Sequence, residues 1–496
     1  MANCKLTILP DARTIIVPEG LSLIEALDEM GIALDSPCGG RGICGKCLVK
    51  ASSAAGLPAE TLACRYVIQG DTILELTAKS TSKINVTSSA QTDTQFAFAV
   101  DIGTTSVEIS MAGLGSGKSI AQASFMNPQR RYGYDVISRI AAAKDLSIRA
   151  RMTDSIRLAI MDSMETMLKK TGIPHSSVER IAVSGNTIMT YLFAGLDVSS
   201  LGVYPYKLEH IDFEKINASQ IGFDLPAASV FLMPPVSAFI GGDITGALAL
   251  INHMAAKERI FFADIGTNGE MFLKDGETIL AISCAMGPAL EGMNISMGMT
   301  VSEGAVVHAA LHADTFLIET IGGGNPAGFA GTGVIDIIAL LLKSGLIRKD
   351  GAFNNAAALN FSNASLAANG FTIGGKLTLN QNDIRNVQLA KAACLSGASI
   401  LLREAALTPD EIGLLIIAGS LGANLNIANF KTLGFLPPFP KAKNFITGNT
   451  SLAAAMRCCL EPSFFDEIKR LRNRIQVIEP ASVSDFSEIF LKSSEF

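Results

Sequence analysis

The stretch Phe98–Thr105 has the sequence FAVDIGTT, and a similar stretch, FFADIGTN, occurs at Phe261–Asn268. Each is an apolar run, typical of a buried strand, that ends in aspartate, glycine and residues with polar side chains. Glycine lets the backbone bend close to a phosphate, while neighbouring N–H and side-chain groups can donate to the phosphate oxygens. One such stretch is a weak signal. Two in order predict two related subdomains that face one nucleotide cleft.

The candidate nucleotide-binding residues come from these stretches and from a third one, Leu414–Gly422, with the sequence LLIIAGSLG. The third stretch is an apolar strand that runs into a glycine loop, and such a loop can accommodate an adenosine. We expect the two aspartates, Asp101 and Asp264, to hold Mg²⁺ through water. The other residues predicted to contact the nucleotide are Gly103, Thr104, Thr105, Gly266, Thr267, Asn268, Gly269, Glu270, Gly419, Ser420 and Gly422.

Two further segments are predicted to connect the subdomains. Pro234–Ile244 lies in the place of a connecting helix, where Asp243 can orient water or metal; a helix cap is the alternative role for this residue. Gly448–Ser451 precedes an alanine-rich run, which predicts the second connecting helix.

Four of the nine cysteines gather near the N-terminus, at Cys38, Cys44, Cys47 and Cys64, and the first three stand in a glycine-rich loop. Two irons bridged by two sulfides need four thiolates, and glycine allows backbone N–H groups to turn toward the sulfurs. A structural zinc site also takes four cysteines, but it usually presents two short Cys-x2–4-Cys pairs. The spacing favours a [2Fe–2S] cluster over zinc or four unrelated thiols.

The cysteines lie in a segment that is predicted to fold as a compact α+β unit. Cys4–Leu9 and Arg13–Val17 alternate in polarity as a hairpin does. Leu23–Met30 has apolar residues at helical spacing, and Asp71–Thr77 has the pattern of a closing strand.

The following segment, residues 79–95, is rich in serine and threonine and poor in large apolar residues, as linkers are. It is either a flexible tether or an ordered strap. The predicted division is therefore a cluster domain at 1–78, a linker at 79–95 and a two-lobed nucleotide-binding domain at 96–496.

Bulk properties exclude several classes of protein. No uninterrupted apolar stretch reaches the roughly 20 residues that span a bilayer. The N-terminus lacks the basic start and apolar core of a secretory signal, so we expect a cytoplasmic protein without a membrane partner. A net charge of −6, with six tyrosines and no tryptophan, argues against a nucleic-acid-binding surface and favours a protein or small-molecule partner.

The N-terminal cysteine segment resembles a [2Fe–2S] ferredoxin of the β-grasp type, with the five-residue first gap of the adrenodoxin-like branch. The three nucleotide stretches resemble the phosphate-1, phosphate-2 and adenosine elements of the superfamily of acetate and sugar kinases, Hsp70 and actin. The fold class implied is a β-grasp ferredoxin domain, α+β, followed by an actin-like (ribonuclease H-like) α/β ATPase domain of two lobes.

The combination resembles the reductive activators of corrinoid proteins. It implies ATP-driven reduction of an inactive Co(II) corrinoid, held on a partner methyl-carrier protein, to Co(I), with an upstream low-potential electron donor. The oligomeric state stays open, a homodimer included. The phrases that carry the resemblance are Asn127-Pro128-Gln129 with Tyr132-Gly133 and Asp135, Gly185-Asn186-Thr187, Asp264–Glu270, Gly287–Gly292 and Gly331–Asp336.

The chain departs from the resemblance in one respect. Well-known members carry an extra domain between the ferredoxin and ATPase parts, whereas here only a short segment separates Thr77 from Phe96. Roles assigned to that piece, such as dimerisation or electron routing, are not carried over to this chain.

Three other functions remain open at this point. The first is an ATP-driven electron donor to another enzyme, such as a CoA-ester dehydratase activator, although those usually use a shared [4Fe–4S] cluster that this spacing disfavours. The second is a small-molecule kinase with a fused redox sensor. The third is a chaperone-like nucleotide switch that docks partners without reducing them.

Overall fold

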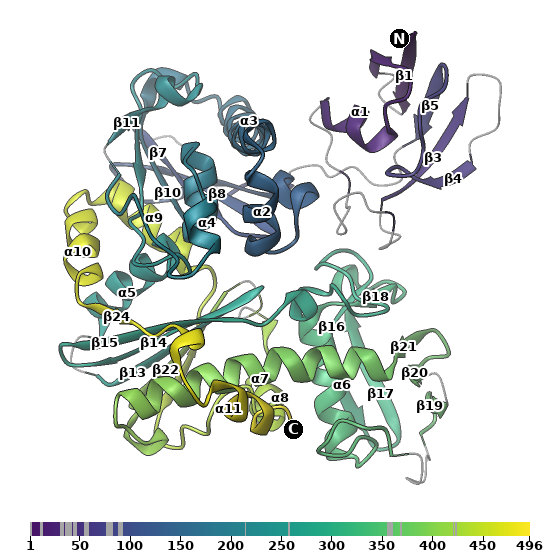
Figure 1. The fold of residues 1–496 in the computed structure, drawn as a ribbon, viewed down its shortest axis with the longest axis vertical. Coiled ribbons are helices and arrows are strands. Elements are labelled where there is room, and N and C mark those ends of the chain that lie inside the picture. The colour runs from purple at the N-terminus through teal and green to yellow at the C-terminus, as the bar shows by residue number, and fades with distance from the viewer. Residues whose placement is uncertain are drawn as a thin grey trace. The chain divides into compact units, whose positions relative to one another are not determined.

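A computed structural model shows two compact units, drawn together in Figure 1. The first comprises Met1–Asp243 and Ser451–Asp466, and the second Ile244–Thr450 and Glu467–Phe496. The chain passes between the units three times, near the start of the helices α5 (Gly242–Met254), α9 (Thr450–Leu460) and α10 (Ser463–Arg472). The residues described are 2–9, 13–29, 34, 42, 47–53, 59–75, 83–87, 93–213, 215–255, 258–354, 361–367, 370–419, 421 and 424–496.

The N-terminal domain is a five-stranded sheet with one described helix, α1 (Leu23–Glu29). Strand order is β2-β1-β5-β3-β4, with β1 antiparallel to β2 and parallel to β5. Leu23 and Leu27 of α1 are buried in the domain core because the helical repeat places them on one face. This β-grasp arrangement confirms the predicted hairpin, helix and closing strand. The strands are β1 (Asn3–Leu9), β2 (Arg13–Pro18), β3 (Leu48–Ser53), β4 (Ala59–Leu62) and β5 (Thr72–Glu75).

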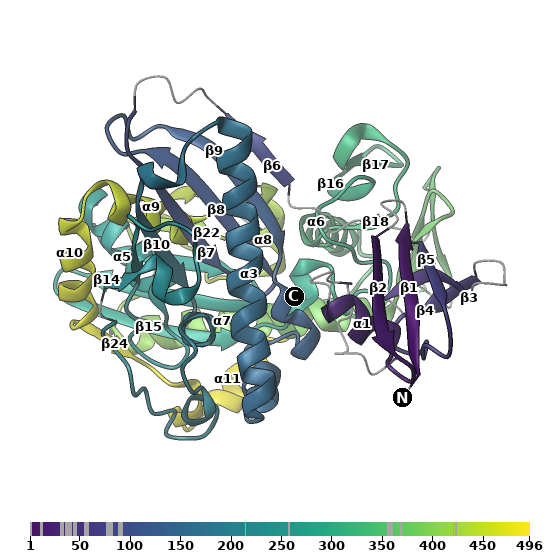
Figure 2. The same ribbon diagram turned by 90° about the horizontal axis from the view of Figure 1, so that it is seen from above.

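The first unit also contains a seven-stranded sheet in the order β11-β12-β10-β7-β8-β9-β6. Figure 2 shows the long helix α3 (Leu146–Thr171) running across this sheet. The helices α2 (Val136–Ala143) and α4 (Thr187–Ala194) belong to the same unit, and α9 contacts β7 and β10 of this sheet. The strands are β6 (Lys83–Val86), β7 (Phe96–Ile102), β8 (Ser106–Gly113), β9 (Ser119–Met126), β10 (Val178–Gly185), β11 (Ile216–Asn217) and β12 (Ser229–Leu232).

The predicted linker is ordered over part of its length. Lys83–Val86 forms the edge strand β6, which pairs antiparallel with β9. Asp93 accepts hydrogen bonds from the backbone N–H groups of Gly115 at 3.0 Å and Ser116 at 2.8 Å. A tether that is flexible from end to end is therefore wrong, and the strap alternative holds at these positions because the exposed edge of β9 offers unpaired backbone groups.

The second unit is built on a six-stranded sheet in the order β23-β22-β13-β14-β15-β24. Its core β15-β14-β13-β22-β23 repeats β9-β8-β7-β10-β12 of the first unit, with the same parallel and antiparallel pairings. The sequence repeat is thus a repeat of structure, and it confirms the actin-like duplication. The strands are β13 (Ile260–Ile265), β14 (Asn268–Asp275), β15 (Thr278–Ala285), β22 (Leu414–Ala418), β23 (Lys443–Ile446) and β24 (Ile475–Val477).

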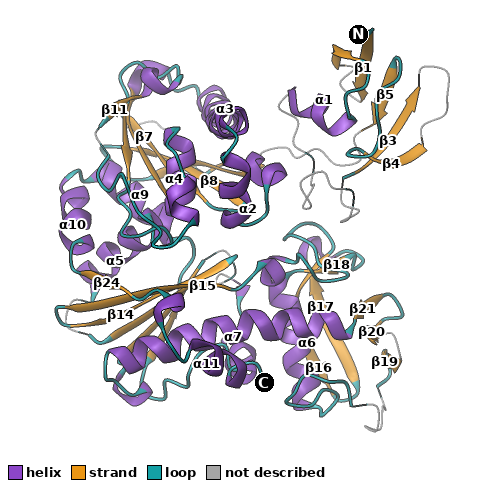
Figure 3. Cartoon of the chain, viewed as in Figure 1, coloured by secondary structure: helices purple, strands orange, loops and turns teal. Residues whose placement is uncertain are grey.

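The second unit also contains helices and two small sheets, and Figure 3 shows the small sheets lying to one side of the main sheet. The helix α7 (Gln381–Glu404) packs along the main sheet, and α6 (Gly331–Lys343) packs on the small sheet β17-β16-β18. The other elements are α8 (Ile427–Leu433), α10 (Ser463–Arg472), α11 (Phe486–Lys492), β16 (Ala305–His312), β17 (Thr315–Thr320), β18 (Gly328–Phe329), β19 (Ala364–Ala367), β20 (Gly370–Ile373) and β21 (Leu377–Leu379).

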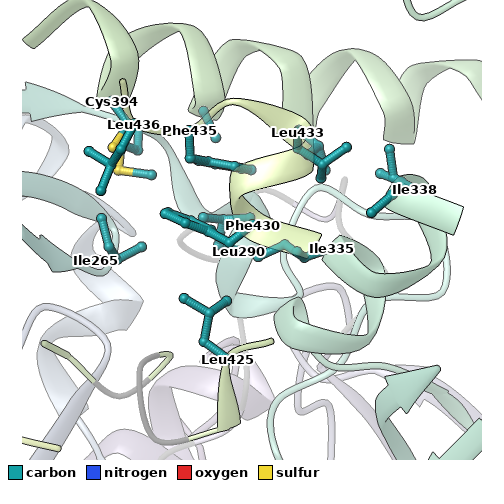
Figure 4. Packing of buried hydrophobic residues seen from close by; sticks show 14 of the residues in the cluster. Ile265, Leu290, Ile335, Ile338, Cys394, Leu425, Phe430, Leu433, Phe435 and Leu436 are labelled. Carbon is teal, nitrogen blue, oxygen red and sulfur yellow. The ribbon is translucent and has the colours of Figure 1, made fainter. Parts of the chain in front are cut away.

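The core of the second unit is held by aromatic and aliphatic packing around α8. Figure 4 shows Phe430 and Phe435 among Leu290, Ile335 and Leu425. The two rings stack with centroids 4.5 Å apart. Burying each such side chain contributes about 1.5–3 kcal/mol, so this cluster fixes the turn near Leu290 against α6.

None of the helices in the described part of the chain has the length and apolar character needed to cross a membrane.

Candidate nucleotide site and cluster-binding cysteines

The first candidate phosphate turn, Gly103–Thr105, joins β7 to β8. A Cβ atom at Gly103 would lie 2.7 Å from the carbonyl oxygen of Ser106, so the turn is too tight for any other residue there. Thr104 is buried, and the side-chain amide of Asn186 donates to its hydroxyl oxygen at 3.0 Å. The predicted residues therefore form one compact turn.

This turn is fixed by hydrogen bonds from Asn127, which precedes the 3-10 turn Pro128–Tyr132, and from Arg139 of α2. The side-chain amide of Asn127 donates to the carbonyl of Gly103 at 2.8 Å. The guanidinium of Arg139 donates to the carbonyl of Thr104. Sequence reasoning missed Arg139, although a signal existed: the arginine lies on the helical face defined by Val136, Ile140 and Ala143, where an apolar residue is expected.

Asp101 is the last residue but one of β7 and contacts the start of α9. The hydroxyl of Ser451 lies 2.6 Å from Asp101 Oδ1 and 2.7 Å from the hydroxyl oxygen of Ser184. The predicted helix after Gly448–Ser451 is confirmed, since α9 begins at Thr450. The contact between Ser451 and Asp101 was not predicted, because the two residues are 350 positions apart.

The second candidate phosphate turn joins β13 to β14. Asp264 lies opposite Glu270 in this ladder. The Thr267 hydroxyl donates to Glu291 Oε1 at 2.7 Å. A Cβ atom at Gly269 would lie 2.6 Å from the sulfur of Met286, so a larger residue there would displace that side chain. The predicted residues of the second turn are thus together as well.

The candidate adenosine stretch lies directly beside this second turn. Its strand β22 pairs in parallel with β13, with Ala418 opposite Asp264. Gly419 has φ +97°, and a Cβ atom there would lie 2.5 Å from Asp264 Oδ1. Ser420 and Gly422 lie outside the described residues.

Asp243 stands in the first turn of α5. The helix begins at Gly242, so Pro234–Gly241 precedes it and is not part of it. Close packing favours glycine at this position, because a Cβ atom at Gly242 would lie 2.6 Å from Cβ of Met233.

Two of the four candidate cluster ligands lie in the described part of the N-terminal domain. The sulfurs of Cys47 and Cys64 are 3.3 Å apart, near enough for both thiolates to bind one metal ion. Cys38 and Cys44 lie outside the described residues, which by themselves hold no group of three or more metal-binding side chains. Paired soft thiolates fit an iron–sulfur cluster.

The cysteines of the second unit and of α9 have a different character. Burial raises the pKa of Cys284 and of Cys459 to about 12. Such thiols stay protonated near neutral pH and are poor nucleophiles and metal ligands. Cys394 lies within the apolar packing of Figure 4.

A β-grasp domain with paired cysteines, followed by duplicated sheets that each carry a phosphate-type turn, defines an iron–sulfur protein fused to an actin-like nucleotide-binding fold. Family models agree with this class. Residues 6–69 match the 2Fe-2S iron-sulfur cluster binding domain, residues 96–256 the RACo middle region, and residues 258–496 the C-terminal domain of RACo, the ASKHA domain. The chain belongs to the RACo family, the reductive activators of corrinoid proteins.

Two curated relatives and one solved structure are similar to the chain. "Corrinoid activation enzyme RamQ" of Eubacterium limosum is 29% identical over 428 residues, 81% of this chain and 70% of the relative. The "[Co(II) methylated amine-specific corrinoid protein] reductase" of Methanosarcina barkeri is 27% identical over 348 residues, 64% of this chain and 62% of the relative. A structure of a "Reductive activator for corrinoid, iron-sulfur protein" aligns with TM-score 0.74 and 24% identity over 99% of this chain and 98% of that one, which shows the same fold.

The model described as the RACo middle region matches residues 96–256, from the start of β7 to just past α5. This match begins after the segment between Thr77 and Phe96, so the absence of an extra domain from that segment stays a prediction.

Proposed function

We propose that this protein is an ATP-dependent reductive activase, which transfers one electron from a [2Fe–2S] cluster to the Co(II) corrinoid of a methyl-carrier protein and restores Co(I). The observation that carries the proposal is the presence, in one chain, of a cysteine-bearing β-grasp domain and a duplicated nucleotide fold. The names of the two curated relatives support the corrinoid as acceptor. We keep the division into a cluster domain at 1–78, a linker at 79–95 and an ATPase domain at 96–496.

The cluster would be held by Cys38, Cys44, Cys47 and Cys64. When bound there, it supplies one electron at a time at low potential. The chain contributes the paired sulfurs of Cys47 and Cys64 and the burial of Cys47, which keeps water from one side of the site. Thiolates that remain available for metal suit a reducing compartment, so a cytoplasmic location is part of the proposal.

ATP with Mg²⁺ would engage the two glycine turns through its phosphates. Asp101, Asp243 and Asp264 would hold the metal through water, and Gly419, Ser420 and Gly422 would accommodate the adenosine. The physical need for ATP is that Co(II)/Co(I) lies below the potential of an ordinary [2Fe–2S] donor, and each deficit of about 59 mV costs tenfold for one electron.

The hydrogen bond between Asp101 and Ser451 gives a bound nucleotide a way to affect the start of α9, where the chain returns from the second unit. Asp101 accepts the hydroxyl of Ser451, which is the first residue of the first unit after the chain returns from the second. A metal ion drawn to Asp101 competes for that carboxylate, so nucleotide binding alters the bond that fixes the start of α9. We infer that this is how nucleotide state reaches the connecting helix.

The decisive experiment mixes the anaerobically reduced protein with Co(II) carrier proteins and follows Co(I) absorbance with and without Mg·ATP. We expect cobalt reduction only with ATP, and none with Cys64→Ser or Asp264→Ala. Cobalt reduction that proceeds equally without ATP would contradict the proposal. ATP turnover that needs a small molecule and no reductant would identify the kinase alternative, and binding without reduction would identify the chaperone-like one. The upstream donor can be sought by the same absorbance assay.

A further inference from the structure

We propose that Asn127 and Arg139 are positioning residues that aim the backbone N–H groups of the turn Gly103–Thr105 at a phosphate. The inference rests on the proposed nucleotide binding and concerns how the site is preorganised. It is carried by the hydrogen bonds that tie the turn to the segment 127–139.

Three successive carbonyl groups of the turn are held by this segment. The side-chain amide of Asn127 donates to the oxygen of Gly103 at 2.8 Å, and its backbone N–H donates to the oxygen of Thr105 at 2.9 Å. Between them, the guanidinium of Arg139 donates to the oxygen of Thr104. All three oxygens therefore point toward the segment 127–139.

Peptide geometry turns this anchoring into a direction for the donors. In a planar trans peptide the C=O of one residue and the N–H of the next point to opposite sides. Fixing the oxygens of Gly103 and Thr104 therefore aims the N–H groups of Thr104 and Thr105 away from the segment. Two successive N–H groups that face the same way form an anion-binding concavity, and their fixed orientation removes the cost of reordering them when a phosphate arrives.

The hydroxyl of Thr104 is directed in a similar way. It accepts a hydrogen bond from the side-chain amide of Asn186 at 3.0 Å. Asn186 is itself fixed, because its other side-chain atom accepts from the N–H of Met189 at 3.0 Å as the cap of α4. A hydroxyl has one proton to give, and this arrangement leaves that of Thr104 for a phosphate oxygen.

The planar guanidinium of Arg139 suits this role because its three nitrogens can make contacts in different directions at once. Its side chain is 0% exposed, its Nε donates to the oxygen of Gly133 at 2.9 Å, and a terminal nitrogen lies 2.8 Å from the sulfur of Met189. One planar group thus ties the phosphate turn to the loop before α2 and to α4. A lysine carries the same charge but lacks this planar group, so it cannot make these bonds together.

The test compares the binding of ATP, ADP and adenosine to the full-length protein by calorimetry. For Arg139→Lys and Asn127→Ala we expect ATP to bind roughly tenfold to hundredfold more weakly, ADP to lose less, and adenosine to change by less than about twofold, as loss of directed phosphate donors requires. Arg157→Lys is the matched control: Arg157 also donates through Nε to a carbonyl, that of Phe193 at 2.8 Å, but does not touch the turn.

The outcomes distinguish failure of nucleotide binding from failure of the positioning role. If wild-type protein binds none of the three ligands, the proposed function fails. If it binds ATP and the variants lose all three ligands equally, or lose none, the positioning role is overturned. Thr104→Val provides a second route should Arg139→Lys fail to fold, since it removes one directed donor from the surface of the turn; an unchanged preference for ATP over adenosine in that variant would also overturn the proposal.

Discussion

The two phosphate-type turns share a sequence pattern but differ in what holds them. The first has its carbonyls tied by Asn127 and Arg139, so its N–H groups are directed outward. The second is closed on itself, with the N–H of Gly266 donating to the oxygen of Asn268 at 3.0 Å. A repeated motif thus fixes the strand and turn, while the surrounding chain decides which of its groups are left for a ligand.

The two threonine hydroxyls show the same difference. Thr104 accepts from Asn186 and keeps its proton for a ligand, whereas Thr267 gives its proton to Glu291 at 2.7 Å. Toward a nucleotide, Thr267 can therefore act as an acceptor, for example from water held by Mg²⁺. We expect both turns to engage the phosphates, and the Thr267 hydroxyl of the second turn to accept in addition from water on the metal ion.

The largest effect on ATP turnover is expected from removing the aspartates at equivalent positions of the two halves, Asp101 and Asp264. Asp264→Ala and Asp101→Ala should each lower ATP turnover more than about a hundredfold, because metal-mediated charge stabilisation contributes several kcal/mol. The iron–sulfur absorbance should stay intact. Asp93→Ala is the control, since this carboxylate accepts from the N–H groups of Gly115 and Ser116 at the opposite end of the β7–β8 strand pair from the first turn. Retained turnover in either variant would remove that aspartate from the site and with it the functional parallel between the halves.

A smaller loss is expected at the close approach between the second turn and β22. Gly419→Ala places a Cβ atom 2.5 Å from Asp264 Oδ1 at φ +97°, which should displace the carboxylate and cost about 1–3 kcal/mol of stability. ATP affinity should fall roughly tenfold. Gly276→Ala is matched for backbone strain, at φ +57°, but has open space around it, so it should lose stability without losing affinity. Equal affinity losses in the two variants would contradict the close-approach explanation.

The hydroxyl of Thr267 should have a modest effect on stability. Thr267→Val leaves the carboxylate of Glu291 without this donor, which should lower the free energy of unfolding in urea by about 1–2 kcal/mol. Thr267→Ser keeps the hydroxyl and should restore most of that stability. A valine variant as stable as the wild type would show that the bond to Glu291 does not distinguish the second turn.

The smallest effect is expected from a buried cation of the second unit. Burial lowers the pKa of Lys391 to about 8 from its ordinary 10.5. The ammonium of Lys391 donates to the oxygen of Ser493 at 2.8 Å. Between pH 8 and 10.5 the folded state binds fewer protons than the unfolded state, so stability should rise with pH over this window relative to Lys391→Met. Below pH 8 the difference should be flat. Urea midpoints across pH 7 to 10.5 measure it, and parallel curves would refute it.

The sequence by itself determined the elements whose signals are local. Alternating and continuous apolar runs marked the hairpin Cys4–Leu9 with Arg13–Val17 and the strands β7, β13 and β22, because a side-chain period reports which face is buried. The cysteine spacing indicated the cluster domain, and Gly448–Ser451 located the start of α9. Each of these signals lies within one short segment of the chain.

Only the tertiary structure decided how those elements are completed. In it, Arg139 donates to the carbonyl of Thr104, and the hydroxyl of Ser451 contacts the carboxylate of Asp101. Residues Lys83–Val86 form an edge strand, although their composition predicted a linker. A hydrogen bond between residues 350 positions apart leaves no local pattern, since any buried polar group needs a partner but its own sequence does not specify which one. The motif could therefore be found from the sequence, while the direction of its donors depends on packing contributed by distant parts of the chain.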